Sequence, residues 1–409
     1  MPFLKLPAQS LPTAKPEQVG LSSERLERVS RVLRSEIESG KIPGAVALVA
    51  RKGQIVYFES FGLRDKASGA PMSKDAIFRL YSMTKPFTSV AAMMLAEDGK
   101  FLIADPVSKF LPQLAKREVS VPQFDGATGK VGYVTVPAER EITIQDLLRH
   151  TSGFVYPGGP NTRVNELYEK GGVGWADQTP EEQLDRLGKV PLAHQPGTTW
   201  EYSLSTDVLG RVVEKVSGMR LGRFFEERIF KPLRMTDTSF VVDNGKLNRL
   251  AQPLAIEPST GQPIKLVDVT VAPKNDAGGA GSAGTTLDYA RFLQMLLNGG
   301  QLDGTRLLSP TTVAFMTADH LGPMKVVQRG GVGTGYGFGL GFAVRTAPGI
   351  AAVSGPVGEY RWGGAAGTAF WVDPSEQMIT ILMTQGAPGP ARGYTSALFR
   401  QMVRQAIVE

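Results

Sequence analysis

The stretch Tyr81-Ser82-Met83-Thr84-Lys85-Pro86 is the one around which we expect this 409-residue chain to be organised, at the start of a predicted helix ending near Asp98. Ser82 and Lys85 are three residues apart, so on a helix their side chains share one face. A lysine amine at that distance can help to activate a serine hydroxyl, which is a weak nucleophile by itself. Pro86 agrees with a helix start, because the first N–H groups of a helix have no intrahelical partner. Ser82 is therefore a candidate nucleophile; the alternative is an ordinary helix serine, since S-x-x-K arises readily by chance.

The composition is that of a globular protein with a large core, at 42% hydrophobic and 21% charged residues. The net charge is +6, but Lys and Arg are mixed with Asp and Glu and form no basic stripe, so we expect no nucleic-acid partner. The sequence contains no run of about 18 apolar residues, so we expect no membrane span. The first residues lack the charged and then apolar pattern of a signal peptide, which predicts a cytoplasmic protein.

Metal and thiol chemistry are not indicated by the residue types present. The chain has no cysteine, which excludes disulfides, thiol nucleophiles and cysteine-ligated metals. Its three histidines, His150, His194 and His320, lack H-x-x-x-H spacing, so we expect no metal site and no other cofactor. His150 lies near Ser152, but residues this close on a turn rarely face each other, and we favour a packing role for it.

The order of predicted elements indicates that both ends of the chain contribute to one α/β unit. Strand patterns occur early and late in the sequence, at 44–51, 54–58, 336–345, 367–372 and 378–384. Between Ala104 and about Asn275 the strand signal fades and helices dominate, with 119–140 predicted to be a glycine- and proline-rich excursion. We therefore expect a discontinuous domain of residues 1–103 and 276–409, interrupted by a mostly helical domain of residues 104–275.

Two serine-hydrolase arrangements fit the residues. The α/β-hydrolase arrangement needs G-x-S-x-G followed by Asp and His, and Ser282, Asp303 and His320 come closest, although position 280 is alanine. The Ser–Lys arrangement needs a second proton carrier. Tyr202 is a candidate, because a nearby lysine ammonium favours the phenolate form of a tyrosine; the alternative for Tyr202 is a core aromatic.

Four motifs follow one another along the chain: Ser82-Met-Thr-Lys85, Ile144-x-x-Leu147-Leu148-x-His150-Thr151-Ser152-Gly153, Pro191-Leu192…Pro196-Gly197…Trp200-x-Tyr202-Ser203, and Trp362-Gly363-Gly364-Ala365. Together they resemble the serine β-lactamase and penicillin-binding protein superfamily, in its class C-like branch, and are most similar to family VIII carboxylesterases. The resemblance spans nearly the whole chain. It implies a β-lactamase/transpeptidase-like α+β fold, with an antiparallel sheet flanked by helices and the active site in the cleft between the two domains.

The resemblance also implies a role for each matching residue. Ser82 is expected to be the acylated nucleophile, Lys85 its activating partner and Tyr202 the proton shuttle. Trp362-Gly363-Gly364 stands at the K-T-G strand position and is expected to contact substrate. The backbone N–H groups of Ser82 and Ala365 are expected to form the oxyanion hole, where each donor is worth about 3–4 kcal/mol.

Two positions that depart from the family pattern indicate whether the substrate is charged or neutral. Leu204 stands where β-lactamases and transpeptidases carry asparagine, and Trp362 replaces the K-T-G lysine that holds a substrate carboxylate. The indole instead offers apolar surface, and Tyr156 is a candidate for the pocket wall, so we expect neutral, short-chain esters. The alternatives are a β-lactamase or amide hydrolase on the same fold, an acyltransferase, and a non-enzymatic binding or sensor protein. The oligomeric state is left open.

Overall fold

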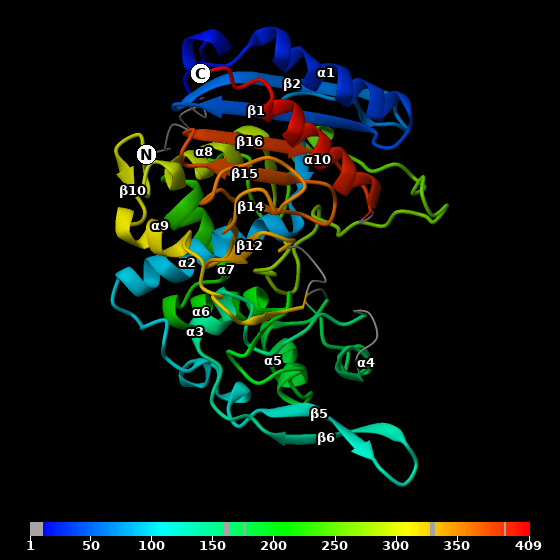
Figure 1. Cartoon of the computed structure of the whole chain (residues 1–409), viewed down its shortest axis with the longest axis vertical. Coiled ribbons are helices and arrows are strands. Elements are labelled where there is room, and N and C mark those ends of the chain that lie inside the picture. Colours follow the sequence, from blue (N-terminus) through cyan, green and yellow to red (C-terminus); the bar gives the residue numbers. More distant parts are fainter. Residues whose placement is uncertain (1–10, 159–162, 175–176, 328–331, 388–389) are drawn as a thin grey trace.

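The computed structural model describes residues 11–158, 163–174, 177–327, 332–387 and 390–409, and its centre is an eight-stranded antiparallel sheet (Figure 1). The strand order is β12-β13-β14-β15-β16-β1-β2-β3. The strands are β1 (Gly44–Arg51), β2 (Gln54–Asp65), β3 (Ala70–Pro71), β12 (Tyr336–Phe338), β13 (Ala343–Arg345), β14 (Tyr360–Gly363), β15 (Ala369–Asp373) and β16 (Met378–Met383). Strands from early and late segments thus build one sheet, and the predicted α+β fold with a helix-flanked antiparallel sheet is confirmed.

Strand β1 is an inner strand of the sheet, between β16 and β2, and is buried on both faces. Because successive side chains of a strand point to opposite faces, Ala45, Ala47 and Val49 pack with helices α1 (Ser23–Glu38) and α10 (Pro390–Arg404). The alternate residues, Val46, Leu48 and Ala50, join the larger core that contains helices α2 (Lys85–Glu97) and α8 (Thr286–Leu297). The sheet is therefore the middle layer of three (Figure 1).

A short strand leads the chain to Ser82. Strand β4 (Ile77–Arg79) pairs with β8 (Ala283–Thr285), and a 3₁₀ turn, Tyr81–Thr84, then precedes α2. We expected the helix to begin at Ser82, whereas the regular α-helix begins at Lys85. Pro86 occupies its first turn, where a missing N–H costs little. The side chains of α2 are buried from Lys85 to Leu95, so this helix is a central element of the core.

The segment between residues 104 and 275 contains several helices and one hairpin. Its helices are α3 (Ile144–Leu148), α4 (Arg163–Lys170), α5 (Pro180–Gly188), α6 (Ser205–Ser217) and α7 (Leu221–Phe225). The hairpin consists of β5 (Glu118–Asp125) and β6 (Lys130–Pro137), which projects from the body at the foot of Figure 1. The excursion expected over 119–140 is thus a β-hairpin that projects from the body. The domain limits at 103/104 and 275/276 stay a prediction.

The remaining elements are short. They are β7 (Thr199–Trp200), β9 (Gln301–Leu302), β10 (Thr305–Arg306), α9 (Pro310–Met316) and β11 (Lys325–Val326). The single strand expected over 336–345 is divided into β12 and β13, because the chain reverses between them and Gly341 takes a positive φ of 102°. Among the helices of the described segments, none has the length and apolar character needed to cross a membrane.

Candidate active site

The backbone enters Ser82 through a strained residue. Tyr81 has a φ of 47°, a left-handed conformation that is uncommon outside glycine and costs on the order of 1–3 kcal/mol. Its hydroxyl accepts the Val267 N–H at 2.8 Å, which helps to hold the conformation in place. In the 3₁₀ turn that follows, side chains three apart are eclipsed. This turn therefore places Ser82 and Lys85 on one face, as their spacing predicted.

Three predicted residues meet at the Ser82 hydroxyl. The Tyr202 hydroxyl donates to Ser82 Oγ at 2.6 Å, and Lys85 Nζ lies 3.4 Å from the same oxygen. Lys85 Nζ also lies over the Tyr202 ring, 4.7 Å from its centroid. Tyr202 comes from the loop between β7 and α6, so the structure brings together groups that are far apart in the sequence.

Lys85 is almost completely buried and has two further acceptors. Its Nζ lies 3.0 Å from the Tyr156 hydroxyl and donates to the Gly279 carbonyl at 2.8 Å. Burial, and then the neighbouring Tyr202, raise the pKa of Tyr156 well above its usual value, so Tyr156 is a neutral phenol. Tyr156, expected to be a wall of the pocket, therefore contacts the lysine directly. With Ser82, the three acceptors match the three hydrogens of a lysine ammonium.

A buried acid, Asp207, supports the lysine from behind, and the sequence reasoning missed it. Its Oδ1 accepts the N–H of Gly279, the residue whose carbonyl binds Lys85, at 3.0 Å. Its Oδ2 has no hydrogen-bond partner among the described residues. Burial raises the pKa of the Asp207 carboxyl, while the charge of Lys85 opposes that shift. A glycine is required at 279, because a Cβ there would lie 2.4 Å from Asp207 Oδ2.

The end of strand β14 passes against the segment that carries Ser82. A Cβ on Gly364 would lie 2.2 Å from the Leu80 carbonyl oxygen, so only glycine permits this approach. The Gly364 N–H donates to Thr368 at 2.7 Å, which turns the chain and leaves Ala365 exposed. Within the described segments no hydrogen bond is found for the Ala365 N–H. The Ser82 N–H lies in the first turn, where its own helix offers no partner.

Aromatic side chains surround the Tyr202 ring. The Trp362 indole packs edge-on against Tyr202 at a centroid distance of 5.2 Å, and it also contacts Phe338. His150 lies 4.9 Å from the Tyr202 ring and is 1% exposed. Burial, and then the charge of Lys85, lower the pKa of His150 well below its usual value, so the imidazole is neutral. These contacts agree with the packing role expected for His150.

Several other sequence candidates form no hydrogen bond with Ser82 within the described residues. Ser282 is buried and hydrogen-bonds Thr84 at 2.7 Å, while Asp303 pairs with Arg291 and His320 contacts the Phe315 carbonyl. The α/β-hydrolase triad is therefore not assembled. Ser152 bonds Ser205 at 2.7 Å rather than His150. Leu204 is 1% exposed and belongs to the core, so its contact with a substrate stays a prediction.

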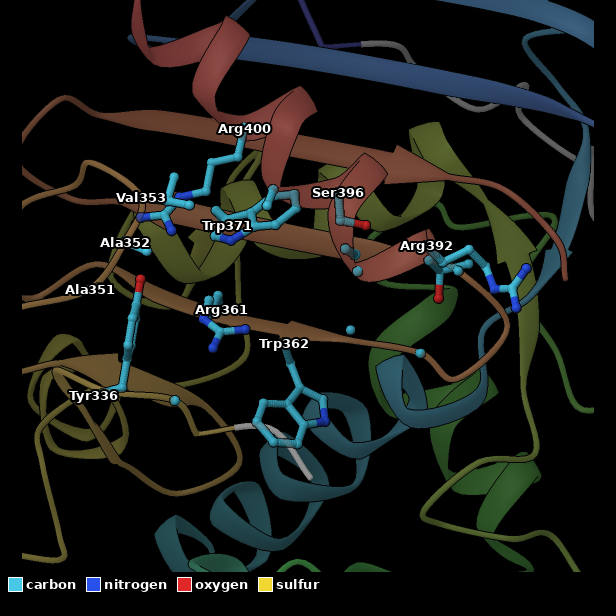
Figure 2. Close-up of a pocket in the computed structure, with 18 of the residues that line it drawn as sticks. Tyr336, Ala351, Ala352, Val353, Arg361, Trp362, Trp371, Arg392, Ser396 and Arg400 are labelled. Atoms are coloured by element: carbon cyan, nitrogen blue, oxygen red, sulfur yellow. The ribbon is translucent and has the colours of Figure 1, made fainter. Parts of the chain in front are cut away.

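A cavity of about 650 Å³ adjoins the predicted oxyanion turn. It is lined by the backbone of the 363–365 turn and by side chains of β14, β15 and α10 (Figure 2). Figure 2 shows the Trp362 indole on the side of β14 away from Trp371 and Ser396. In the same view Arg361 lies between Trp362 and Trp371. Within the described part of the chain no group of three or more His, Cys, Asp or Glu could hold a metal.

Known proteins resemble this chain in sequence and in fold. The Beta-lactamase family model matches residues 29–401. Esterase EstB of Burkholderia gladioli is 31% identical over 89% of this chain and 92% of its own length, and the lovastatin esterase of Penicillium rubens is 30% identical over 91% and 95%. The solved structure of EstCE1, a hydrolase with promiscuous acyltransferase activity, matches with a TM-score of 0.75 and 28% identity over 93% of this chain and 98% of that one. The family model matches most of the chain, and Lys85 and Tyr202 both lie at the Ser82 hydroxyl. The chain therefore belongs to the beta-lactamase family.

Proposed function

We propose that this protein is a serine carboxylesterase that hydrolyses neutral, short-chain esters through an acyl-enzyme on Ser82. The observation that carries the proposal is the Ser82 hydroxyl, held 2.6 Å from the Tyr202 hydroxyl and 3.4 Å from Lys85 Nζ. A hydroxyl in this position can lose its proton to a neighbour as it attacks a carbonyl. The esterases among its relatives support an ester as the substrate.

The first half of the reaction forms the acyl-enzyme. Ser82 Oγ attacks the ester carbonyl carbon as Tyr202 and Lys85, acting as one acid–base pair, take its proton. The pair starts with one vacant proton site, either as phenol and free amine or as phenolate and ammonium, so that Tyr202 can accept this proton. The carbonyl oxygen becomes negative and accepts hydrogen bonds from the N–H groups of Ser82 and Ala365. The carbon–oxygen bond then breaks, and the alcohol leaves with the proton from Tyr202.

The second half releases the acid. Water attacks the acyl carbon, its proton passes to Tyr202, and the same two N–H groups hold the oxyanion. The bond to Ser82 Oγ breaks, and the serine recovers a proton from Tyr202. No metal or organic cofactor takes part in either half.

The substrate preference follows from the groups around the site. Trp362 puts an indole beside Tyr202 where a carboxylate-binding lysine stands in the family pattern. A neutral acyl group contacts this aromatic surface without the cost of removing a charge from water. The cavity at the 363–365 turn lies on the α10 side of β14, and Ser82, Lys85 and Tyr202 do not line it, so the proposed preference rests on Trp362 and Tyr202 rather than on this cavity.

Hydrolysis of p-nitrophenyl acetate and butyrate tests the proposal. We expect turnover by the wild type and its loss in Ser82→Ala, with a fluorophosphonate adduct on the peptide that contains Ser82. Ser282→Ala is the matched control, because this buried serine lies near the site and bonds Thr84 rather than the reacting groups. Background turnover by a folded wild type, or full activity in Ser82→Ala, contradicts the proposal. A chromogenic cephalosporin in the same assay tests the β-lactamase alternative.

Acyl transfer is a second candidate activity, because EstCE1 is described as a hydrolase with promiscuous acyltransferase activity. In this reaction an alcohol replaces water in the attack on the acyl-enzyme. Methanol added to the p-nitrophenyl butyrate assay then gives methyl butyrate at the expense of butyric acid. Butyric acid as the only product at every methanol concentration excludes it.

A further inference from the structure

The β5–β6 hairpin exposes apolar side chains far from the active site. Beyond its base, nearly every residue of the two strands is exposed, including Phe124 at 70%, Val131 at 59% and Tyr133 at 52%. Phe124 lies directly opposite Val131, and Pro122 lies opposite Tyr133, so these four side chains form one patch on one face of the hairpin. A two-stranded hairpin is marginally stable when it stands alone in water.

The outer edge of β6 is also unprotected. The run Val131-Gly-Tyr-Val-Thr-Val136 contains no charge and no proline, and within the described residues only β5 is found to hydrogen-bond its backbone. Other edges of this protein are blunted: β5 carries Pro122, and the edge strands of the main sheet, β3 and β12, are very short. A long, uncharged, exposed edge is a template for pairing with another strand.

We propose that β6 pairs antiparallel with β6 of a second copy of this chain, forming a four-stranded sheet in the order β5-β6-β6-β5 across a two-fold axis. The charges around the run favour this occupant. Lys130 precedes the run and Glu139 follows it, and both residues are exposed. Antiparallel pairing brings Lys130 of each copy toward Glu139 of the other, so opposite charges meet at both ends while the uncharged residues meet in the middle.

The dimer is expected to be weak and dependent on concentration. A pair of strands of this length buries less than the roughly 1,200 Å² of a standard stable interface. The hairpin projects from the end of the molecule opposite β1 and β2 (Figure 1), so pairing there leaves the Ser82 site of each copy open. The inference does not depend on the proposed catalytic activity.

Analytical ultracentrifugation over a micromolar concentration series tests the dimer. We expect Tyr133→Lys, which places two like charges near the two-fold axis, to make the protein monomeric with unchanged thermal stability and ester hydrolysis. Phe124→Lys is the matched control, because it adds the same charge to the same face on β5, away from the axis, and should leave the dimer intact. A wild type that is monomeric at every concentration overturns the proposal, and so does a dimer that Phe124→Lys dissociates as well as Tyr133→Lys.

Cross-linking gives a second readout, since the chain has no cysteine of its own. Val134→Cys and Thr135→Cys should each be tested, because the approach of Lys130 to Glu139 puts the two-fold axis at one of these two positions, which then faces its own copy within disulfide reach. Under mild oxidation we expect a covalent dimer from at least one of them and little from Phe124→Cys. Equal cross-linking at all three positions shows random collision and overturns the proposal, even if the wild type sediments as a dimer.

Discussion

Asp207 and Lys85 are joined through a single residue, Gly279, although neither side chain contacts the other. The Gly279 N–H donates to Asp207 Oδ1 at 3.0 Å, and the Gly279 carbonyl accepts from Lys85 Nζ at 2.8 Å. By holding the N–H of Gly279, Asp207 fixes the backbone that carries the carbonyl acceptor of Lys85. Asp207 thereby positions the ammonium that faces Ser82 from within the core.

Replacing Asp207 with asparagine separates its charge from its hydrogen bond, because an amide oxygen still accepts the Gly279 N–H. We expect kcat for p-nitrophenyl butyrate to fall about tenfold, equivalent to ~1.4 kcal/mol of barrier, with little change in KM. Asp207→Ala, which removes both, should lose more. An Asp207→Asn enzyme with wild-type kcat contradicts this positioning role.

The same variant should alter the pH dependence of stability. Burial raises the pKa of the Asp207 carboxyl in the folded chain. A carboxyl with a raised folded pKa contributes stability that is complete below its unfolded pKa and is lost as the pH rises through the folded value. The difference in Tm between Asp207→Asn and the wild type should therefore grow in favour of the variant from pH 4 to pH 8. A constant difference across this range contradicts the assignment.

Tyr202 and Tyr156 should respond differently to loss of their hydroxyl groups. Tyr202 contacts Ser82, and a proton carrier typically contributes 10²–10⁴ in rate, so Tyr202→Phe should lower kcat by about that factor. The Tyr156 hydroxyl contacts the lysine, which keeps two acceptors without it, so Tyr156→Phe should cost less. Tyr57→Phe, whose hydroxyl bonds Ser30 far from the site, serves as the control. A larger loss from Tyr156→Phe than from Tyr202→Phe reverses the two roles.

Two Gly→Ala substitutions should change different properties: Gly364→Ala the rate of ester hydrolysis, and Gly393→Ala the stability of the fold. In Gly364→Ala the new Cβ lies 2.2 Å from the Leu80 oxygen, so the 363–365 turn must move. We expect kcat to fall about 10²–10³-fold, the loss seen when one oxyanion donor is removed. Gly393 lies in α10 with nothing within 4 Å of the added Cβ, and its replacement should stabilise the fold by about 0.5–1 kcal/mol. Urea unfolding and ester kinetics should be measured for both variants. A similar kcat in the two variants contradicts the oxyanion role proposed for the 363–365 turn.

His150 should make the fold less stable in mild acid. Burial, and then the charge of Lys85, hold its pKa well below the usual 6.5. Its contribution is complete above the unfolded pKa and is lost as the pH falls below it, because only the unfolded chain takes up the proton. The free energy of unfolding should drop by up to ~1.4 kcal/mol per pH unit from this residue. His150→Asn, which tolerates the φ of 57° at this position, should flatten the decline in urea titrations between pH 5 and 8. If the free energy of unfolding of His150→Asn falls with pH as steeply as that of the wild type, His150 is not the cause of the decline.

The residues of the candidate site could be predicted from sequence where the signal is local. Ser82 and Lys85 share one helical turn, and the Gly363-Gly364 pair marks the close approach that the structure shows at Leu80. Asp207 could not be predicted, since its partner, Gly279, is reached only after the chain has folded. One signal was present: an acid stands directly before Val208 and Leu209, two core residues of a predicted helix.

The hairpin was predicted only in part. Its glycines and prolines indicated an excursion over 119–140, and Gly129 does take a positive φ of 66°, but the two strands were not predicted. The alternating valines of both strands carried the correct signal, but they fit a strand only because Val119 and Val136 are anchored in the body. Tertiary contacts of this kind decide whether a segment is a loop or a strand, and they cannot be inferred from local composition.

The pairing of β1 with β16 has a consequence for how the protein is made. Val46 lies opposite Met383 in the middle of the sheet, so β1 is synthesised long before its neighbour. At about 5–20 residues per second, tens of seconds pass on the ribosome before β16 emerges. During that time a strand that ends up buried on both faces has one open edge and an uncovered apolar surface. Nascent chains of this protein should therefore engage chaperones until translation is nearly complete, and the sheet should close only afterwards.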